Sequence, residues 1–406
     1  MALEGVEGQL HIELCWCQGK VTRVAVRSTR PLLMPRIFIG KSPSDVVTTL
    51  PLIFSVCGVA QGCAAAEALE QALAIPVSPA CLQRRRMLVA LETVREHLWR
   101  IELDWAGFLN RSPVREDIAR IAALIRDFRT TLFPEENPFI PGGVEPKMDM
   151  NRFHARMEEL ERLLEARVFS RPIHIWLEIS DWAELVAWSR ECDTPAQELL
   201  CRLEKRGDAG VGSSQVSALG ELDTRYLNQR LTGADADCFI AQPDWQGAPA
   251  ETTPFTRRRG HPMLRSLETQ YGSGLLTRMT ARLVESALLI RELRAGIICP
   301  EKSEAVVNDS DAGSGIGISR IEAARGRLVH RVELEAGLVS NYQILAPTEW
   351  NFHPRGVLVS AFEGLETDNE ASLKQMAELL INAIDPCVSY QLRIDRSGYG
   401  AEPTGE

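Results

Sequence analysis

Two short stretches place a cysteine beside turn-forming residues, where a thiolate could bind a soft metal ion. Cys57 stands in SVCGVAQGC, in which Gly58 allows a tight backbone turn around a ligand and Cys63 follows six residues after Cys57. Cys387 stands in AIDPCVSY, directly after an Asp-Pro pair that would end a helix. Neither stretch has the C-x-x-C spacing of a two-thiolate clamp, so the residues alone fit either a metal site or a buried, inert sulfur.

Other patterns in the chain favour packing over chemistry. The CWC stretch at 15–17 puts two thiols on one face of a strand, and it would need two further ligands to bind a metal. The seven histidines form no H-E-x-x-H pair. The GSGIG run at 313–317 lacks the G-x-G-x-x-G spacing of a dinucleotide site and is expected to be a flexible loop. We therefore assign no catalytic residue.

Composition narrows the class of protein. The 406 residues are 45% apolar, which is enough to bury a sizeable core. The net charge of −10 gives no general attraction to nucleic acid or to a membrane, and the isolated arginines 257–259 are expected on the surface or in internal ion pairs. No stretch approaches the ~20 apolar residues of a membrane helix, and the acidic N-terminus does not resemble a signal peptide. We expect a cytoplasmic protein whose ten cysteines are reduced.

The elements expected to position the two thiols are helices flanked by short strands. Alternating apolar residues between Leu10 and Val26 predict a β-hairpin within the N-terminal region 6–30. Helical patterns then fill a core from about 62 to 295. Cys57 would therefore precede the first helix of this core, and a thiol at a helix terminus can face a shared pocket.

The C-terminal region 318–396 returns to strands and closes with a helix. The segments RLVHRVEL and LVSNYQIL predict a hairpin. The final helix is expected to start at a capping-box pattern that begins with Thr367 and to end at Asp385. We expect an α+β fold, a central helical bundle with small peripheral β-sheets from both chain ends, as a single unit over 1–396 with a flexible tail at 397–406.

Six motifs, in the same order along the chain, resemble the large subunit of nickel–iron hydrogenases. They are VEGQLHIEL (6–14) for I-E-G-H-L-R-I-E, SVCGVAQGC (55–63) for R-I-C-G-V-C, PGGV (141–144) for a proline- and glycine-rich loop, EAARGRLVH (322–330) for E-A-P-R-G-x-x-x-H, NYQILAPTEWNFHPRG (341–356) for N-Y-Q-x-x-x-P-T-x-W-N-x-x-P, and DPCVSY (385–390) for D-P-C-x-x-C. The resemblance implies a fold like that of the nickel–iron hydrogenase large subunit.

The chain departs from that family at two cysteines. In the family, four thiolates hold a nickel–iron centre, and the second cysteine of each motif bridges the two metals. Here Ala60 and Tyr390 stand at the bridging positions. Alanine has no donor atom, and the tyrosine oxygen is a hard donor that cannot replace a soft thiolate. The resemblance therefore implies that no nickel is bound and that hydrogen is not turned over.

The motifs that hold the iron ligands in that family are retained. By resemblance, Arg325 would donate a hydrogen bond to one cyanide of an iron group and compensate the negative charge of that cyanide. The N–H and hydroxyl of Thr348, which follows Pro347, would hold the other cyanide. This combination resembles the hydrogenase formation proteins of the HupK/HoxV type, diverged large-subunit relatives understood as scaffolds for assembly of the iron cofactor.

The resemblance implies a non-enzymatic accessory protein that binds an Fe(CN)2CO group transiently. Cys57 and Cys387 are the expected iron ligands, with Cys63 as a third candidate. In the enzyme the first two positions hold nickel, so a scaffold would shift the iron toward them. The expected partners are the hydrogenase large-subunit precursor and other maturation proteins. Two alternatives stay open, a metal-free chaperone or inactive relative that acts through protein contacts, and a redox enzyme with mononuclear iron.

Overall fold

The computed structural model describes residues 8–134, 137–143, 148–296 and 315–396. The predicted flexible tail at 397–406 lies outside the described residues, as do parts of three stretches quoted above, at 6–7, 144 and 313–314.

The described chain combines many helices with short strands. The strands are β1 (Gln9–Cys17), β2 (Lys20–Ser28), β3 (Ser217–Ala218), β4 (Ala250–Glu251), β5 (Ile316–Ala323), β6 (Gly326–Glu335), β7 (Leu338–Leu345) and β8 (Ser389–Asp395). The helices are α1 (Pro43–Ile53), α2 (Gly58–Ala72), α3 (Pro79–Trp99), α4 (Ala106–Phe108), α5 (Arg115–Leu132), α6 (Met150–Leu164), α7 (Ile173–Trp176), α8 (Trp182–Ser189), α9 (Pro195–Lys205), α10 (Thr224–Thr232), α11 (Ala236–Ala241), α12 (Pro254–Arg258), α13 (Pro262–Tyr271), α14 (Leu275–Arg294), α15 (Pro347–Asn351), α16 (Val357–Phe362) and α17 (Glu370–Ile384). Short 3-10 turns η1 (Met34–Phe38) and η2 (Ser55–Cys57) and π-helical turns η3 (Arg100–Trp105) and η4 (Glu165–Phe169) complete the described set.

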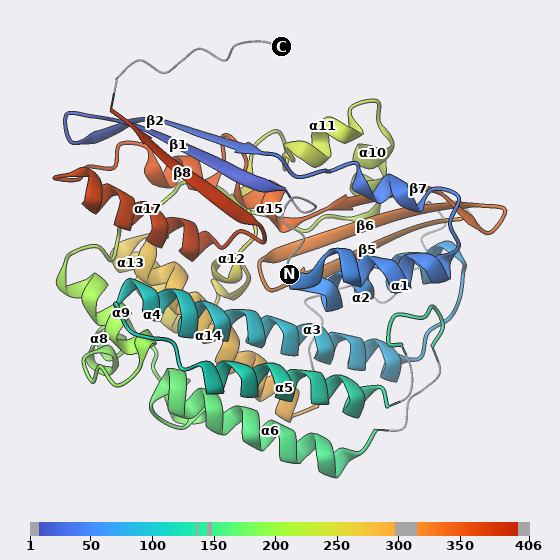
Figure 1. The fold of residues 1–406 in the computed structure, drawn as a ribbon, viewed down its shortest axis with the longest axis horizontal. Coiled ribbons are helices and arrows are strands. Elements are labelled where there is room, and N and C mark those ends of the chain that lie inside the picture. Colours follow the sequence, from blue (N-terminus) through green and yellow to red (C-terminus); the bar gives the residue numbers. More distant parts are fainter. Residues whose placement is uncertain (1–7, 135–136, 144–147, 297–314, 397–406) are drawn as a thin grey trace.

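The helices form the predicted bundle, and α14 is its centre. Helices α3, α5 and α6 run side by side across the lower half of Figure 1, and α14 packs against α3, α6, α9, α13 and α17. Almost every residue of α14 is buried, including Arg278, Arg282 and Glu285. A helix that buries charges on its faces needs partners for them, so this bundle contains ion pairs as well as apolar packing. Among the described residues, no helix is both long enough and apolar enough to cross a membrane.

The two chain ends meet in one three-stranded sheet. β1 and β2 form the predicted antiparallel hairpin, with Gln18 and Gly19 at positive φ in its turn. β8 then pairs in parallel with β1, so that Leu10 lies opposite Tyr390. The sequence did not predict β8, because its residues are mostly exposed and only pairing with β1 makes the segment a strand.

A second three-stranded sheet contains β5, β6 and β7 in antiparallel order. The predicted β6–β7 hairpin is confirmed, with Ala336 and Gly337 at positive φ in its turn. β5 was not predicted, and it begins at Ile316 and Gly317, which were expected to lie in a flexible loop. That expectation was wrong because Ile318 and its neighbours pair with β6 and pack on α2.

Helix α2, whose N-terminus carries Cys57, lies directly on β5. Its alanines, such as Ala64 and Ala68, are fully buried and leave room for close approach. The Ser319 hydroxyl donates to the Ala64 carbonyl at 2.7 Å. A Cβ on Gly317 would come within 1.8 Å of the Ala68 carbonyl oxygen, so only glycine fits there. This contact fixes α2 against the second sheet.

Two predicted helix starts need correction. The helical core was expected from about 62, but α1 already begins at Pro43 and α2 at Gly58. Glycine and valine weaken the helical signal at the start of α2, and tertiary contacts override it. α17 is capped by the Asn369 side chain, which accepts from Ser372 N, and not by the pattern at Thr367. The predicted end of α17 at Asp385 is confirmed.

Replacing Gly317 with alanine is expected to lower the free energy of unfolding by roughly 1–3 kcal/mol or more, because the methyl group overlaps the carbonyl of Ala68. Gly107→Ala is the control, since a Cβ on Gly107 would meet nothing within 4 Å. Denaturant unfolding of both variants measures the difference. Equal stabilities for the two variants would show that the close contact between α2 and β5 is absent.

Candidate functional site

A cavity lies where the second sheet, the N-terminus of α2 and the end of α17 meet. Four of the predicted site residues line it, Cys57, Cys387, Arg325 and Pro347. The next residue, Thr348, is buried, and its hydroxyl lies 2.8 Å from the Cys387 sulfur. The structure therefore gathers residues that are up to 330 positions apart, from Cys57 to Cys387, around one space.

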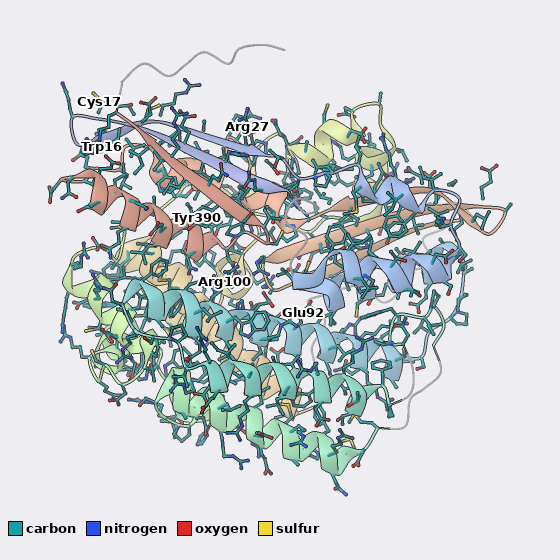
Figure 2. The ribbon with its side chains drawn as sticks, in the orientation of Figure 1. Trp16, Cys17, Arg27, Glu92, Arg100 and Tyr390 are labelled. Atoms are coloured by element: carbon teal, nitrogen blue, oxygen red, sulfur yellow. The ribbon has the colours of Figure 1, made fainter. Side chains whose placement is uncertain are left out.

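Cys57 is held by the start of α2. It is the N-cap residue, and the two carboxylate oxygens of Glu92 on α3 accept from the N–H groups of Val59 and Ala60, the second and third residues after Cys57, at 2.9 Å each. A carboxylate at a helix N-terminus is favourable because it satisfies free N–H groups and faces the positive end of the helix dipole. Burial raises the pKa of Glu92 to about 7. Figure 2 shows Glu92 on α3, just below α1.

Gly58 serves a different purpose from the expected one. Its φ is −59°, an ordinary helical value, so it does not provide a special turn around a ligand. A Cβ at this position would lie 2.7 Å from the Pro51 carbonyl oxygen. Glycine is required because α1 and α2 approach each other closely directly beside Cys57.

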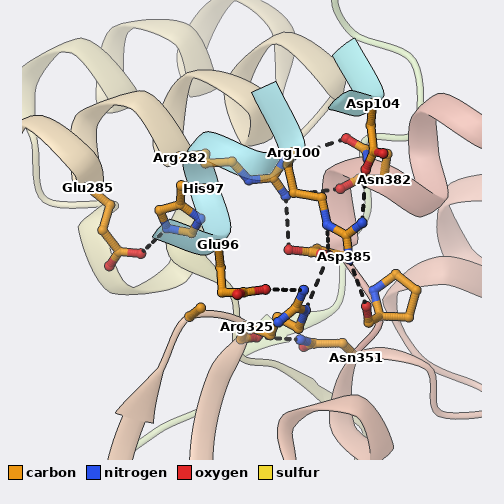
Figure 3. Close-up of polar contacts among 12 residues, drawn as sticks. Glu96, His97, Arg100, Asp104, Arg282, Glu285, Arg325, Asn351, Asn382 and Asp385 are labelled. Carbon is orange, nitrogen blue, oxygen red and sulfur yellow. Dashed lines mark hydrogen bonds and ion pairs between the residues drawn. The ribbon is translucent and has the colours of Figure 1, made fainter. Parts of the chain in front are cut away.

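Cys387 is held by the end of α17. The helix ends at Asp385, which has a φ of 67° and a buried side chain. The Asp385 carboxylate forms ion pairs with Arg100 at 2.8 Å, Arg325 at 3.3 Å and Arg282 at 3.5 Å (Figure 3). Burial acts to raise the pKa of Asp385, but the three arginines outweigh it and hold the pKa well below its ordinary value.

Arg325 joins this charge cluster to the cavity. Its Nη2 donates to Glu96 at 3.1 Å, and the Arg325 carbonyl accepts from Asn351 at 3.0 Å. The following residue, Gly326, has a φ of 136°, and a Cβ there would meet the Thr252 carbonyl oxygen at 2.0 Å. Within the described part of the chain, the buried Nη1 of Arg325 has no hydrogen-bond partner. A buried guanidinium N–H without a partner suits an anionic acceptor in the cavity.

Both acidic and basic groups lie near the two sulfur atoms and have opposite effects on the pKa of the Cys57 thiol. Burial is the largest cause that raises the pKa of the Cys57 thiol, and Cys387 and Glu92 raise it further, while Arg325 lowers it. Cys57 is consequently a protonated thiol at neutral pH unless a cation compensates the thiolate. Arg325 and Arg30 are the cations close enough to interact with both sulfur atoms.

Sequence reasoning missed Arg30 and Gln61. The Arg30 side chain lines the same cavity and pairs with buried Glu349 at 2.5 Å. Nothing in the sequence near Arg30 indicated this role. The Gln61 amide lies 3.7 Å from the Cys57 sulfur. Gln61 follows Cys57 by four residues in a helical segment, so the i, i+4 rule could have predicted the contact.

The structure argues against Cys63 as a third ligand. Cys63 is fully buried, and its sulfur lies 3.8 Å from the Arg85 carbonyl, outside the cavity lining. Six residues span about one and two thirds turns of an α-helix, so the two side chains point in different directions and face different neighbours. Across the described ranges, no group of three or more His, Cys, Asp or Glu side chains could hold a metal ion. The cavity therefore offers two protein thiols.

The two substituted cysteine positions supply no ligand to the cavity. Ala60 is fully buried, and its N–H is used by Glu92. Tyr390 lies in β8 with 38% of its surface exposed, and its position on that strand can be seen in Figure 2. Neither residue lines the cavity.

The arginines 257–259 form ion pairs within the protein. Arg257 pairs with buried Glu285 at 2.8 Å, Arg258 with the same carboxylate at 3.3 Å, and Arg259 with Glu268. His97 also contacts Glu285, at 2.9 Å (Figure 3). Arg257 and Arg258 thus lie in internal ion pairs, whereas the Arg259 side chain is 52% exposed and its ion pair lies at the surface, so each of the two expected settings occurs.

Known proteins give the same assignment as the motifs. The model of the nickel-dependent hydrogenase family matches residues 218–389. The hydrogenase expression/formation protein HupK of Azotobacter vinelandii is 30% identical, over 95% of this chain and 98% of that protein. The chain belongs to the family of hydrogenase expression/formation proteins. Its relative HoxV of Cupriavidus necator, with the same description, is 28% identical over 93% of this chain and 94% of HoxV.

The fold of this expression/formation family member is that of a hydrogenase large subunit. The nickel–iron–selenium hydrogenase of Desulfovibrio vulgaris Hildenborough matches with a TM-score of 0.63 and 16% identity, over 91% of this chain and 94% of the hydrogenase chain. The α+β prediction with small sheets from both chain ends is thereby confirmed.

Asp385→Asn is expected to lower the free energy of unfolding by about 3–5 kcal/mol, because it leaves three buried or partly buried arginines without their shared carboxylate. Asparagine keeps the size of the side chain and tolerates the positive φ. Denaturant unfolding at pH 7 measures the loss. Because the folded-state pKa is lowered, the stabilisation is complete above the ordinary value of 3.8 and is lost as the pH falls below it.

Asp104→Asn is the matched control for Asp385→Asn. Asp104 pairs with the same Arg100 at 2.9 Å, but 32% of its side chain is exposed. Its loss should cost less than about 1 kcal/mol. Equal effects of the two variants would contradict the central role of Asp385.

Proposed function

We propose that the protein is a non-catalytic accessory protein of nickel–iron hydrogenase maturation. In this proposal it is a scaffold that transiently holds an Fe(CN)2CO group as cargo and passes it to the hydrogenase large-subunit precursor. The observation that carries the proposal is the cavity itself, in which Cys57 and Cys387 lie with Arg325, a buried cation whose Nη1 has no hydrogen-bond partner among the described residues. The names of the relatives support a role in hydrogenase formation.

The chemistry of the lining suits this cargo. Thiolates are soft ligands that bind iron well, and cyanide and carbon monoxide need a site from which water is excluded. Phe54, Leu328 and Val388 contribute apolar wall to the cavity. Arg325 would donate to one cyanide and compensate its negative charge.

Thr348 takes a modified role in the proposal. Its hydroxyl contacts the Cys387 sulfur at 2.8 Å, so this group would orient a thiolate. The backbone N–H of Thr348 stays the proposed donor to the second cyanide, as the resemblance implies. Pro347 forms the adjoining part of the cavity wall.

Two protein ligands fit a holder that must release its cargo. A finished centre in the large subunit uses four thiolates, whereas this cavity offers two and has no donor from Ala60 or Tyr390. Fewer ligands bind a metal less tightly, which favours transfer to a site with more. The same donor set argues for iron without nickel. A cytoplasmic setting, which keeps thiols reduced, belongs to the proposal.

A metal-free chaperone is the second candidate. It is favoured by the lack of a three-ligand group in the described ranges and by the raised pKa of the Cys57 thiol, which keeps that sulfur protonated until a cation arrives. Such a protein would act through contacts with the large-subunit precursor and with other maturation proteins.

The proposal is tested by anaerobic purification from cells with intact hydrogenase maturation machinery, followed by metal analysis and infrared spectroscopy. We expect about one iron per chain, no nickel, and cyanide and carbonyl stretching bands. Stoichiometric nickel would refute the scaffold. A protein without iron or these bands that still binds the precursor would favour the chaperone.

Single cysteine variants test the ligands in the same preparation. Cys57→Ala and Cys387→Ala are each expected to abolish most of the infrared bands, because each removes one of two thiolates. Cys63→Ala is the control and should keep the bands, since the Cys63 sulfur lies outside the cavity lining. Bands that survive the loss of Cys57 or Cys387 would contradict the ligand assignment.

A further inference from the structure

A buried chain of hydrogen bonds leads from the second sheet to Cys57. The Tyr342 hydroxyl lies 2.9 Å from Nδ1 of His330, and Nε2 of His330 lies 2.9 Å from Oε1 of Gln61. Nε2 of Gln61 then lies 3.7 Å from the Cys57 sulfur, within the range of a hydrogen bond to sulfur. Gln61 is 1% exposed and His330 is fully buried. None of these three polar side chains has a role in the proposal above.

The donor and acceptor chemistry of the side chains fixes the direction of each hydrogen bond in this series. The amide oxygen of Gln61 can only accept, so the proton of neutral His330 must be on Nε2. Nδ1 of His330 then carries no proton and accepts a hydrogen bond from the Tyr342 hydroxyl. Burial lowers the pKa of His330 to about 3, and burial raises the pKa of Tyr342, so both groups keep these states at neutral pH. The NH2 group of Gln61 consequently faces the Cys57 sulfur.

The hydrogen-bonded side chains are held by rigid secondary-structure elements. His330 lies in β6 and Tyr342 in the neighbouring strand β7. The Tyr342 ring packs against His330, with ring centres 5.7 Å apart, and against Phe38 at 5.6 Å. Gln61 is in the first turns of α2, which lies on the same sheet. The amide is therefore held from the sheet side while it points toward the sulfur.

We propose that Gln61, oriented by His330 and Tyr342, is a positioning residue that donates a hydrogen bond to the Cys57 sulfur when that sulfur binds the iron group as a thiolate. This inference rests on the proposed function. A hydrogen bond stabilises the thiolate and draws electron density from the sulfur, which weakens its bond to iron. Cys387 has a comparable partner in the Thr348 hydroxyl. The two contacts together would adjust how readily the iron group leaves.

The first experiment needs no iron. The full-length protein is purified from cells that lack hydrogenase maturation machinery, and alkylation of Cys57 by iodoacetamide is followed against pH by peptide mass spectrometry. Gln61→Leu is expected to raise the pKa of Cys57 by about one unit, which is a tenfold loss of reactivity at a fixed pH below that pKa. Gln61 and leucine are similar in volume, so the variant mainly removes the donor.

Gln71→Leu is the matched control. Gln71 lies on the same helix, and its amide oxygen accepts from Ile318 N of the same sheet at 2.9 Å, but Gln71 is not part of the cavity lining. Its loss should leave the alkylation profile of Cys57 unchanged. Equal profiles for the two variants, with both proteins folded by circular dichroism, would overturn the inference.

Tyr342→Phe tests whether Tyr342 and His330 orient the Gln61 amide. Phenylalanine keeps the ring that packs on Phe38 but removes the hydroxyl that fixes the His330 tautomer. We expect a shift of the Cys57 profile in the same direction as for Gln61→Leu, but smaller, about threefold in reactivity. A profile identical to that of the unchanged protein would show that Gln61 acts without His330 and Tyr342.

The iron-loaded protein gives a second readout. In Gln61→Leu the sulfur donates more electron density to iron, so the carbonyl band should move to lower frequency while Gln71→Leu leaves it in place. If the unchanged protein carries no cyanide or carbonyl bands, the proposed function fails, but the alkylation experiment still decides whether Gln61 positions the thiolate. If the bands are present and neither readout responds to Gln61→Leu, the inference alone fails.

Discussion

The carboxylate of Asp385 is the interaction on which the cavity depends. It attracts Arg100 at the end of α3, Arg282 in α14 and Arg325 at the β5–β6 turn, so it joins the bundle, the second sheet and the final helix at one buried point. Removing charges from water is costly, and a buried ion cluster is tolerated only when all its members are paired. Cys387 follows Asp385 by two residues. The position of the ion cluster therefore also determines where the second thiol lies.

Both thiols lie at helix ends. Cys57 lies in the 3-10 turn η2 directly before α2, and Cys387 follows the end of α17. Helix ends leave backbone groups without partners, and the protein satisfies them near Cys57 with the Glu92 carboxylate. The side chains next to the sulfur atoms are then free to act on the thiols. The Gln61 amide and the Thr348 hydroxyl lie within hydrogen-bond distance of one sulfur each.

The chain has the fold of a hydrogenase large subunit, and two thiols line its cavity. Its fold matches that subunit across 91% of the chain, although only 16% of the aligned residues are identical. The motif that begins with Glu322 retains Arg325 and Gly326, and a Cβ at position 326 would collide with the Thr252 carbonyl oxygen. Close backbone contacts of this kind restrict the residue type strongly, which explains why glycine stands at position 326.

The sequence by itself determined the α+β class through its hydrophobic periodicity and the family through the resemblance of six motifs, but that Cys57 and Cys387 share one cavity became evident only in the structure. It also indicated the end of α17 at Asp385, which proline and turn chemistry impose locally. Only the tertiary structure decided that β8 pairs with β1, that Cys63 lies outside the cavity lining, that Arg30 lines the cavity, and that His330 contacts the Gln61 amide next to Cys57. These features join residues as much as 380 positions apart, as in the pairing of Leu10 with Tyr390. Contacts of that kind arise from packing between elements, which neither spacing nor periodicity encodes.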